Sequence, residues 1–298
     1  FNRTFYVINR IKVAGIGNDF VFGGIDGDTI VAGNGNNVVL GDSGYIDWTA
    51  AADIGRFYAA TPYAAGTLSG DDRIATDIDR IFSTAPDHGG NDTITTGDGN
   101  DIIIGGEDGE IVIDVIIGVA SDVARTVAAA ASDGDTIDAG QGNNIVFGDN
   151  GRITAARQDA VNFAGLPITL GLVETIESLI GGSDTITTGV GRDIVLGGID
   201  ADVIVANFGE YGFAENGAAL GADADNIVIG DSGYIDWTAV DEGRHYADQS
   251  TPLAGTRSGD DQDALDIDRI WSTEPDHGGN DRITTGDGND IIIGGEDG

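Results

Sequence analysis

The sequence predicts an all-β solenoid, and three observations support this prediction. First, acidic residues recur at a spacing of nine: Asp92 and Asp101 each follow a Gly-Asn pair within residues 89–109, GGNDTITTGDGNDIIIGGEDG. Second, each is followed by a triplet of strand-forming residues with an apolar residue at its centre. Third, 49 of the 298 residues are glycine and only 5 are proline. Turns that alternate with short β-formers at a fixed period are typical of stacked solenoid coils.

The charge of the chain points to metal ions as partners. It carries 51 Asp and Glu against 14 Lys and Arg, a formal net charge of -37, although 40% of its residues are hydrophobic. That hydrophobic content separates it from a disordered acidic tail. Self-repulsion on this scale opposes compaction unless cations screen it, and it disfavours nucleic acid as a partner. We therefore expect a metal-binding protein that does not bind nucleic acid.

Other features of the composition exclude further classes. The chain has no cysteine, which excludes disulfides and zinc–thiolate sites. The longest apolar stretch, residues 111–131, is interrupted by Asp114, Asp122 and Arg125, so we expect no direct membrane insertion. The chain also lacks methionine and starts with a strand-like run at residues 5–8. We expect it to be an excerpt of a longer protein.

The chain divides into repeat blocks and excursions, the latter being stretches of different composition between the blocks. The excursions are richer in alanine and aromatic residues, and two of them end in the strand-like runs DIDRIFST and DIDRIWST. The predicted order is an entering strand over residues 1–14, block 1 over 15–48, an excursion over 49–87, block 2 over 88–154 with an inserted segment over 110–134, an excursion over 155–180, block 3 over 181–237 with an inserted loop, an excursion over 238–276, and the start of a truncated block 4 over 277–298.

Two further expectations concern this organisation. The Ala-rich residues 119–132 predict a short helix inside the inserted segment. Residues 37–109 match residues 226–298 at about two-thirds of their positions, so a longer repeat spans two blocks. The excursions either pair into a neighbouring sheet or lengthen the rod.

The spacing of the repeats implies a specific chemistry. With a strand of about three residues and a turn of about six, two nonapeptides complete one coil, and turns eighteen residues apart stack about 4.7–4.9 Å from one another. Glycine lets such turns adopt positive φ, so that their carbonyls converge. Aspartate supplies the oxygen ligands that Ca²⁺ requires, six to eight of them at about 2.3–2.6 Å. Stacked carboxylates repel one another without a cation, so we expect several bound Ca²⁺ ions.

The array resembles the RTX family, the acidic glycine-rich nonapeptide repeats GGxGxDxUx of secreted bacterial proteins. The matching stretches are residues 15–22 (GIGNDFVF), 97–104 (GDGNDIII), 286–293 (GDGNDIII) and, more loosely, 181–187. The resemblance implies a calcium-binding parallel β-roll (β-solenoid), with Ca²⁺ in the turns and the apolar residue at the eighth repeat position inside the coil. Carried over by position, the implied calcium ligands are Asp19, Asp28, Asp92, Asp101, Asp135, Asp184, Asp193, Asp202, Asp281 and Asp290.

The sequence departs from the family pattern in three ways. Asn37, Asn144 and Asn226 stand at the ligand position in the last turn of a block, so those three sites lose a charge. Asp26 and Asp108 place an acid where the motif has glycine. Long excursions also break the array into blocks, which makes it look more like the repeat regions of giant surface adhesins and extracellular matrix proteins.

We find no catalytic constellation and predict that the chain is not an enzyme. The Gly-Asp-Ser-Gly turns at residues 41–44 and 230–233 resemble the nucleophile turn of a protease, but the third copy, residues 148–151, has no hydroxyl. A serine triad also needs a histidine base, and the only histidines are His88, His245 and His277, two of which lie in repeated PDHGG turns. The Gly-Asp turns are better interpreted as the ends of the roll blocks.

The leading functional hypothesis is structural. Calcium would fold and stiffen an extracellular rod belonging to a bacterial surface adhesin, sheath or filament, with self-association into a fibre or sheath. One alternative is an adhesin module whose excursions bind carbohydrate, ice or a host receptor. A second alternative is the secretion and folding appendage of an enzyme. All three hypotheses place the chain outside the cell or on the bacterial surface.

Overall fold

The structure, a computed structural model, describes residues 5–6, 11–48, 77–85, 88–108, 134–156, 162–208, 224–237, 264, 267–286 and 288–296. The helix expected within residues 119–132 lies outside these ranges, as does most of the excursion at residues 49–87. Within the described ranges, no helix combines the length and the apolar character needed to cross a membrane.

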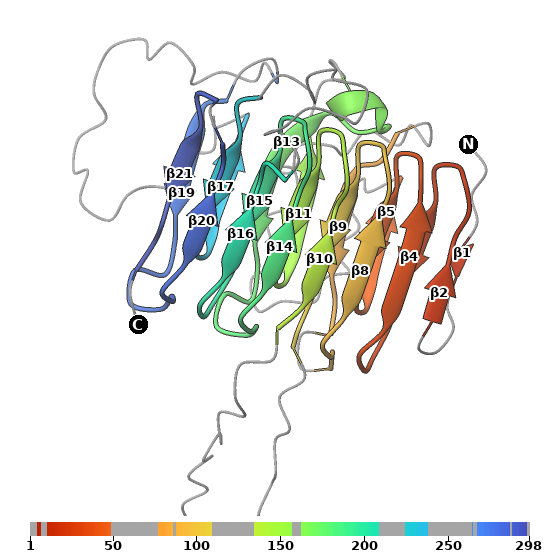
Figure 1. The fold of residues 1–298 in the computed structure, drawn as a ribbon, viewed down its shortest axis with the longest axis horizontal. Coiled ribbons are helices and arrows are strands. Elements are labelled where there is room, and N and C mark those ends of the chain that lie inside the picture. The colour runs from red at the N-terminus through yellow and green to blue at the C-terminus, as the bar shows by residue number, and fades with distance from the viewer. Residues whose placement is uncertain are drawn as a thin grey trace, which may run out of the picture.

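Two parallel sheets run side by side along the stack of coils, which advances from the N-terminal to the C-terminal end (Figure 1). Sheet A contains β1 (Phe5–Tyr6), β3 (Phe20–Phe22), β5 (Val38–Leu40), β9 (Ile102–Ile104), β11 (Ile145–Phe147), β15 (Ile194–Leu196), β17 (Ile227–Ile229) and β21 (Ile291–Ile293). Sheet B contains β2 (Ile11–Val13), β4 (Thr29–Gly33), β8 (Thr93–Thr96), β10 (Thr136–Asp138), β14 (Thr185–Thr187), β16 (Val203–Val205) and β20 (Arg282–Thr284). In both sheets the strands follow chain order.

Each coil contributes one strand to each sheet, and the middle residues of these strands fill the space between the sheets. For example, β3 and β4 belong to one coil, and they pair in parallel with β5 and β8 of the next. The fully buried middle residues form a single apolar cluster that includes Val21, Ile30, Val39, Ile94, Ile103, Ile137, Val146, Ile186, Val195, Ile204 and Val228. The predicted parallel β-roll, with the apolar residue of each repeat inside the coil, is confirmed.

The outer faces of the two sheets differ. In β8 of sheet B only Ile94 and the last residue are buried, whereas Thr93 faces solvent. In sheet A all three residues of β5, β9, β11, β15 and β17 are buried. A parallel strand that is apolar at every position needs cover on both faces, so sheet A requires a further layer.

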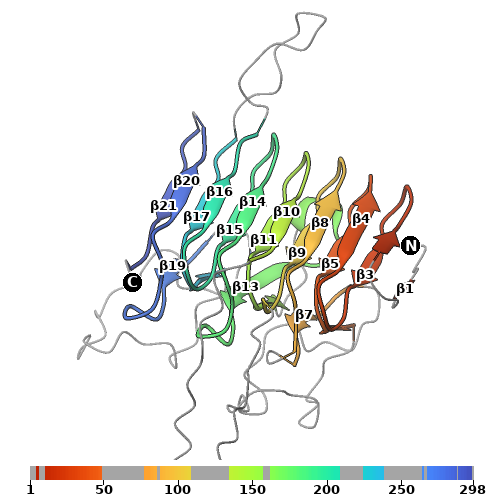
Figure 2. The same cartoon turned by 60° about the horizontal axis from the view of Figure 1, so that its bottom comes forward.

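That layer is sheet C, which contains six antiparallel strands in the order β19-β18-β13-β12-β7-β6. The excursions therefore pair into a neighbouring sheet. Figure 2 shows β7, β13 and β19 on the side of sheet A opposite to sheet B. The strands are β6 (Gly44–Asp47), β7 (Arg80–Ser83), β12 (Gly151–Ala155), β13 (Leu170–Thr175), β18 (Gly233–Asp236) and β19 (Arg269–Ser272), and the 3-10 helix η1 (Phe163–Gly165) lies between β12 and β13.

Packing between sheets A and C forms the second apolar core. Leu40 and Phe147 of sheet A belong to one buried cluster with Ile81 and Ile153 of sheet C. Trp48 packs against the same cluster and meets the ring of Phe20 edge-on, with 5.5 Å between ring centroids. The sheet order is therefore B, A, C, with one core on each side of sheet A.

Two rows of turns connect sheets A and B. At the A-to-B edge the chain passes from a sheet A strand to a sheet B strand, and at the B-to-A edge it returns. The sheet C strands all arise at the A-to-B edge, between β5 and β8, between β11 and β14, and between β17 and β20. These are alternate coils in the order of sheet A.

Candidate metal sites

The A-to-B edge carries an uninterrupted column of aspartates, each placed directly before a sheet B strand. The backbone N–H of each one except the last donates to Oδ1 of the aspartate in the next coil, with N···O distances of 2.6–2.9 Å. We call this column the aspartate ladder; it consists of Asp28, Asp92, Asp135, Asp184, Asp202 and Asp281.

Four members of the ladder have a second carboxylate oxygen that lacks compensation. Oδ2 of Asp92, Asp135, Asp184 and Asp202 is buried and receives no hydrogen bond from any described residue. Burial raises the pKa of Asp92 to about 7, and burial together with neighbouring carboxylates raises the pKa of Asp135 and Asp184 well above the usual range. A buried ionised carboxylate without a counter-charge costs several kcal/mol. The ladder therefore requires protons or cations.

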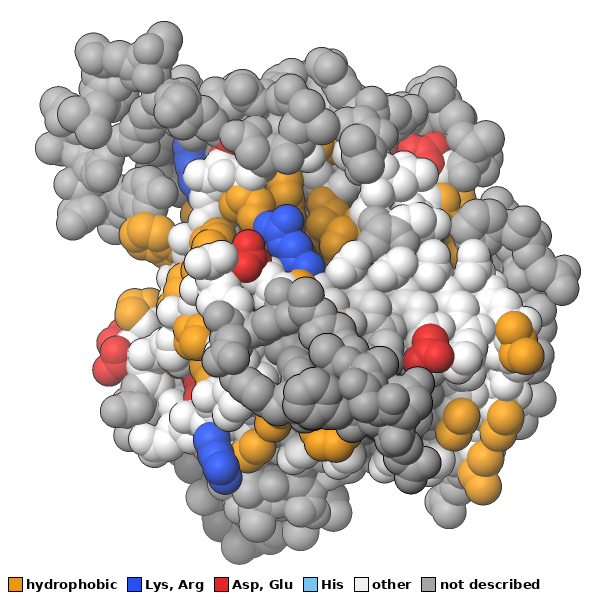
Figure 3. All heavy atoms as spheres, turned by 45° about the horizontal axis from the view of Figure 1, so that its top comes forward, with side chains coloured by type: hydrophobic (Ala, Val, Ile, Leu, Met, Phe, Trp, Pro, Cys, Tyr) orange, Lys and Arg blue, Asp and Glu red, His pale blue; other side chains and the backbone are white. Residues whose placement is uncertain are grey.

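This burial agrees with the appearance of the surface. On the face shown in Figure 3, the described surface is mostly backbone and uncharged side chains, with acidic groups only scattered over it. The four ladder members Asp92, Asp135, Asp184 and Asp202 are each at most 2% exposed. Their charge is thus concentrated inside the turns.

Glycine forms the wall opposite the ladder carboxylates. A Cβ placed on Gly41 would lie 2.0 Å from Oδ2 of Asp92 and 2.4 Å from the carbonyl oxygen of Gly105 in the next coil. The same two kinds of oxygen lie 1.9–2.6 Å from the corresponding point at four further glycines, Gly105, Gly148, Gly197 and Gly230. Carboxylate and carbonyl oxygens that converge with no side chain between them match the ligand preference of Ca²⁺.

At the first coil, a side-chain cation occupies an equivalent position. Lys12 is only 4% exposed, and its ammonium donates to the carbonyl of Gly23 at 2.8 Å and lies 2.9 Å from Oδ2 of Asp28. A glycine carbonyl and a ladder carboxylate are the two groups that converge in the other turns as well. The residues of the A-to-B edge therefore fit a cation, and their all-oxygen donors fit Ca²⁺.

The B-to-A edge is built differently, because aspartate and asparagine alternate there. Each backbone N–H except the last again donates to Oδ1 in the next coil, at 2.7–3.1 Å. We call this column the mixed ladder; it consists of Asp19, Asn37, Asp101, Asn144, Asp193, Asn226 and Asp290. Its asparagines precede β5, β11 and β17, the sheet A strands of the coils from which sheet C arises.

Asn37 shows what the amide does in this ladder. Its Nδ2 donates to the carbonyls of Gly33 and Gly35, at 3.0 and 2.9 Å, and to Oδ1 of Asp101 at 3.0 Å. The side chain is fully buried. A donor nitrogen thus faces the converging carbonyls where a cation would otherwise lie. This arrangement does not fit Asn37 as a calcium ligand.

The rest of the mixed ladder is also partly satisfied by hydrogen bonds. Nδ2 of Asn144 and Nδ2 of Asn226 each donate to a backbone carbonyl at 3.2 Å. Oδ2 of Asp193 accepts a bond of 2.5 Å from the Thr188 hydroxyl. Burial raises the pKa of Asp193 and of Asp101 to about 7. This edge therefore has fewer uncompensated oxygens than the aspartate ladder.

The structure adds a third set of carboxylates, which the sequence pattern predicts only as turn residues. Asp42, Asp149 and Asp231 are the second residues of the turns that lead into sheet C. Oδ2 of each accepts a backbone N–H from the turn of the next coil, from Glu107, Ile199 and Glu296 respectively. The sequence did hold a signal for them: in the three Gly-Asp-x-Gly copies the aspartate is constant, whereas the third residue varies between Ser and Asn.

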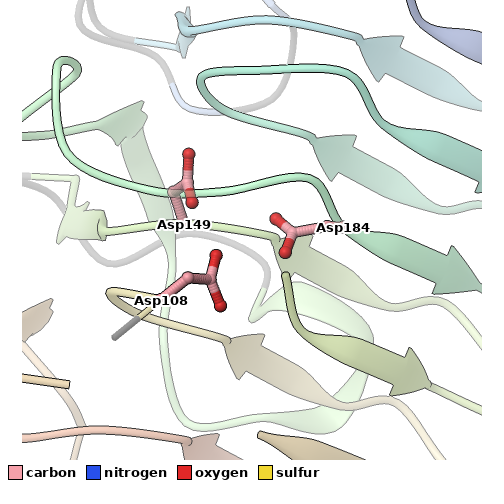
Figure 4. Close-up of side chains that lie close together, drawn as sticks. All are labelled: Asp108, Asp149 and Asp184. Carbon is pink, nitrogen blue, oxygen red and sulfur yellow. The ribbon is translucent and has the colours of Figure 1, made fainter. Parts of the chain in front are cut away.

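One member of this set joins two other carboxylates. Asp108, Asp149 and Asp184 each place one oxygen within 4.8 Å of the others, and all three side chains are buried (Figure 4). Among the described residues this is the one such group of three or more potential metal-ligating side chains. Of the three, only Asp184 was expected to be a ligand from the repeat spacing.

Comparison with known proteins identifies the repeats. The family model for the RTX calcium-binding nonapeptide repeat (4 copies) matches residues 13–45, 88–109, 130–152, 180–210 and 277–298. These segments contain every member of the aspartate ladder. No curated protein and no solved structure matches the chain. The chain therefore contains RTX calcium-binding repeats, and these repeats build its parallel β-roll.

Proposed function

We propose that the chain is a calcium-dependent structural module of an extracellular bacterial protein, a surface adhesin, sheath or filament. Calcium folds and stiffens the roll. The observation that carries this proposal is the aspartate ladder, in which the buried Oδ2 atoms of Asp92, Asp135, Asp184 and Asp202 face glycine carbonyls without compensation. A cation in each turn would neutralise two neighbouring carboxylates and link one coil to the next.

The geometry of the ladder supports a mechanical role. Its members follow one another along the same axis as the strand pairing of sheets A and B. Ions in consecutive turns therefore reinforce the direction in which the coils stack. A solenoid is stabilised mainly by contacts between adjacent repeats, so extra links between coils stiffen the whole rod.

The charge supports an extracellular location. A chain of net charge -37 with buried carboxylates is unstable where free calcium is low. Extracellular calcium modules commonly bind with dissociation constants of about 10⁻⁴–10⁻³ M. Ligands that bind only the folded state stabilise it by mass action. The chain would therefore stay unfolded in the cytosol and fold after it leaves the cell.

A calcium titration of the metal-stripped chain tests the proposal, with circular dichroism and light scattering recorded on one sample. We expect cooperative gain of β-signal as calcium is added and its loss on adding excess chelator. A stripped chain that already has full β-signal and does not respond to calcium would refute the proposal. Growth in particle size after folding would favour a fibre or sheath, whereas folding without growth would favour a monomeric spacer.

A second candidate function is ligand binding, and the outer face of sheet B favours it. Thr93, Thr136 and Thr185 are paired in register across three neighbouring strands, and all three are exposed. The adjacent row contains Thr95 and Thr187 on either side of Asp138. A flat, regularly spaced hydroxyl array suits an ordered ligand such as a polysaccharide or ice.

The bulky substitution Thr136→Tyr tests this second candidate. It should weaken retention on insoluble polysaccharide, or reduce thermal hysteresis of ice growth, without changing the calcium-induced β-signal. If the wild-type chain shows neither polysaccharide binding nor hysteresis, the array has no such role.

A further inference from the structure

Asp108 differs from its counterparts in the other coils. It occupies the fourth place of its A-to-B turn, as Asp26 and Asp200 do in theirs. Asp26 and Asp200 are exposed, whereas Asp108 is only 7% exposed. In the turns of Asp26 and Asp200, one residue separates the fourth-place aspartate from the ladder, but residues 109–134 separate Asp108 from Asp135. The carboxylate of Asp108 is thus the one of these three that lies inside the A-to-B edge.

Asp149 approaches the same place from the next coil. Its Oδ1 accepts the N–H of Gly182 at 3.0 Å, and its Oδ2 accepts the N–H of Ile199 at 2.6 Å. These bonds hold the carboxylate between its own coil and the following one. Asp231 accepts the matching pair of bonds, from the N–H groups of Gly279 and Glu296, in the last of the three turns from which sheet C strands arise. Asp231 therefore serves as the matched control position for Asp149 within the same chain.

Asp184 of the aspartate ladder completes the group. Figure 4 shows the three carboxyl groups gathered around a common space. Among the described residues, no N–H group donates to either oxygen of Asp108 or to Oδ2 of Asp184, and the neighbour of the Asp108 carboxyl is another acid, Asp135. Both side chains are more than nine-tenths buried. These oxygens need a partner that the described part of the chain does not provide.

Glycine lines the group on two sides, where any side chain would collide with the carboxylates. A Cβ on Gly182 would lie 2.5 Å from Oδ2 of Asp108. A Cβ on Gly148 would lie 1.9 Å from Oδ2 of Asp184 and 2.4 Å from the carbonyl oxygen of Gly197. Two glycines therefore border the group, and a backbone carbonyl adds a neutral oxygen to it.

Electrostatics require that the charge of this group be neutralised, by protons or by a cation. Burial, and then the neighbouring Asp184, raises the pKa of Asp108 to about 9. Burial, followed by the charges of Asp184 and Asp108, raises the pKa of Asp149 well above the usual range. Three like charges in a buried site are strongly unfavourable until a multivalent cation neutralises them. Calcium affinity rises with the number of charged ligands, and here three carboxylates converge instead of the two that neighbour each other along the ladder.

We propose that Asp108 and Asp149 join Asp184 of the aspartate ladder in a three-carboxylate site, which binds one Ca²⁺ more tightly than the ordinary repeat turns. Two of its ligands lie outside the nonapeptide ligand position. The ion links the coils of β9 and β11, and Asp149 extends the link to the coil of β15 through Ile199. The site fills first and fixes the middle of the roll, next to the strands of sheet C. This inference rests on the proposed calcium-dependent function.

Matched variants of the full 298-residue chain test the site. Calcium binding would be measured by isothermal titration calorimetry and by equilibrium dialysis on metal-stripped Asp108→Asn and on its control, Asp200→Asn, which removes the same charge from the same repeat place at an exposed position. We expect Asp108→Asn to weaken the tightest calcium site by about tenfold or more, and Asp200→Asn to leave it unchanged. Asp149→Asn and Asp231→Asn form a second pair, with the larger effect at Asp149.

Three outcomes separate the possibilities. If Asp108→Asn and Asp200→Asn behave alike, or if all wild-type sites have one affinity, the proposed three-carboxylate site is excluded while the calcium-dependent fold stands. If the wild-type chain binds no calcium at all, the proposed function itself fails. Circular dichroism of each variant at saturating calcium checks folding. A collapse of Asp108→Asn under those conditions, with Asp200→Asn folded, would assign Asp108 a structural role and overturn the proposal.

Discussion

At the scale of single residues, the two turn edges use different atoms for the same task. Converging carbonyls and carboxylates need a positive partner, and at some positions the chain provides one itself, such as the ammonium of Lys12 at the start of the aspartate ladder and the amide of Asn37 in the mixed ladder. Elsewhere in the aspartate ladder the described residues offer no such donor to Oδ2 of Asp92, Asp135 or Asp202. We infer that calcium dependence is concentrated at the A-to-B edge.

Replacing Asn37 by aspartate should create a new calcium requirement. Asn37→Asp removes the donor that faces the carbonyls of Gly33 and Gly35 and puts a second buried carboxylate beside Asp101. Leaving these buried acceptors unsatisfied costs about 1–3 kcal/mol without a metal ion. The midpoint of calcium-induced folding should therefore move to higher calcium, and the number of ions taken up on folding should rise by one.

The slope of stability against the logarithm of calcium concentration measures that number. Asn36→Asp is the matched control, because it adds the same charge one residue earlier, where the side-chain oxygen already accepts the N–H of Asn100. If Asn36→Asp and Asn37→Asp have the same midpoint and slope, the amide of Asn37 does not replace a cation.

At the scale of the elements, the nonapeptide period predicts the two sheets of the roll, but it does not decide whether the excursions form a third sheet or lengthen the rod. A nonapeptide specifies its own strand and turn, so β3, β8 or β14 can be located from local residues alone. The pairing of β7 with β12 joins segments that are far apart in the sequence, and local pattern cannot choose their partner. One signal did exist. Triplets such as Ile102-Ile103-Ile104 are apolar throughout, unlike Thr93-Ile94-Thr95, and this difference predicts cover on both faces of sheet A.

The spacing of sheet C explains why its strands arise from alternate coils. Neighbouring strands lie about 4.7–4.9 Å apart in any sheet. Two coils of the roll therefore advance by the same distance as one pair of strands in sheet C. When every second coil contributes a pair of strands, sheets A and C have the same length along the stack of coils. A pair from every coil would make sheet C longer than sheet A. The alternation of Asp and Asn in the mixed ladder follows the same two-coil period.

The candidate sites show the same difference: some follow from the local repeat, and others depend on contacts between distant segments. Ladder positions such as Asp92 and Asp135 follow from the repeat register, because each has the same place in its nonapeptide. The burial of Asp108 does not follow from it, because Asp26 and Asp200 share its place and are exposed. Likewise, the bond from Asp149 to Ile199 depends on the stacking of one coil on another. Sequence spacing thus finds the repeated ligand and misses the carboxylates that converge only in three dimensions.

At the scale of the whole molecule, the buried carboxylates predict an unusual pH dependence for the calcium-free chain. In the folded state the pKa is raised to about 7 for Asp92, Asp101 and Asp193, to about 9 for Asp108 and to about 10 for Asp42, in each case mainly by burial. In the unfolded chain these groups titrate near pH 4. Between these limits the folded state holds more protons, so stability is greatest below about pH 4 and falls as the pH rises through about 7 and then 9–10.

We therefore expect the calcium-free chain to keep more β-structure at pH 6 than at pH 9, as measured by circular dichroism on metal-stripped protein at constant ionic strength. Both values lie above the sequence pI of about 4.1, so isoelectric precipitation does not interfere. The calcium-saturated chain is the control, and its trend should reverse, because protons compete with Ca²⁺ for the same carboxylates. Calcium-free protein that gains β-structure from pH 6 to pH 9 would contradict the burial of these groups. The opposite trends with and without calcium would show that protons and calcium ions neutralise the same buried carboxylates.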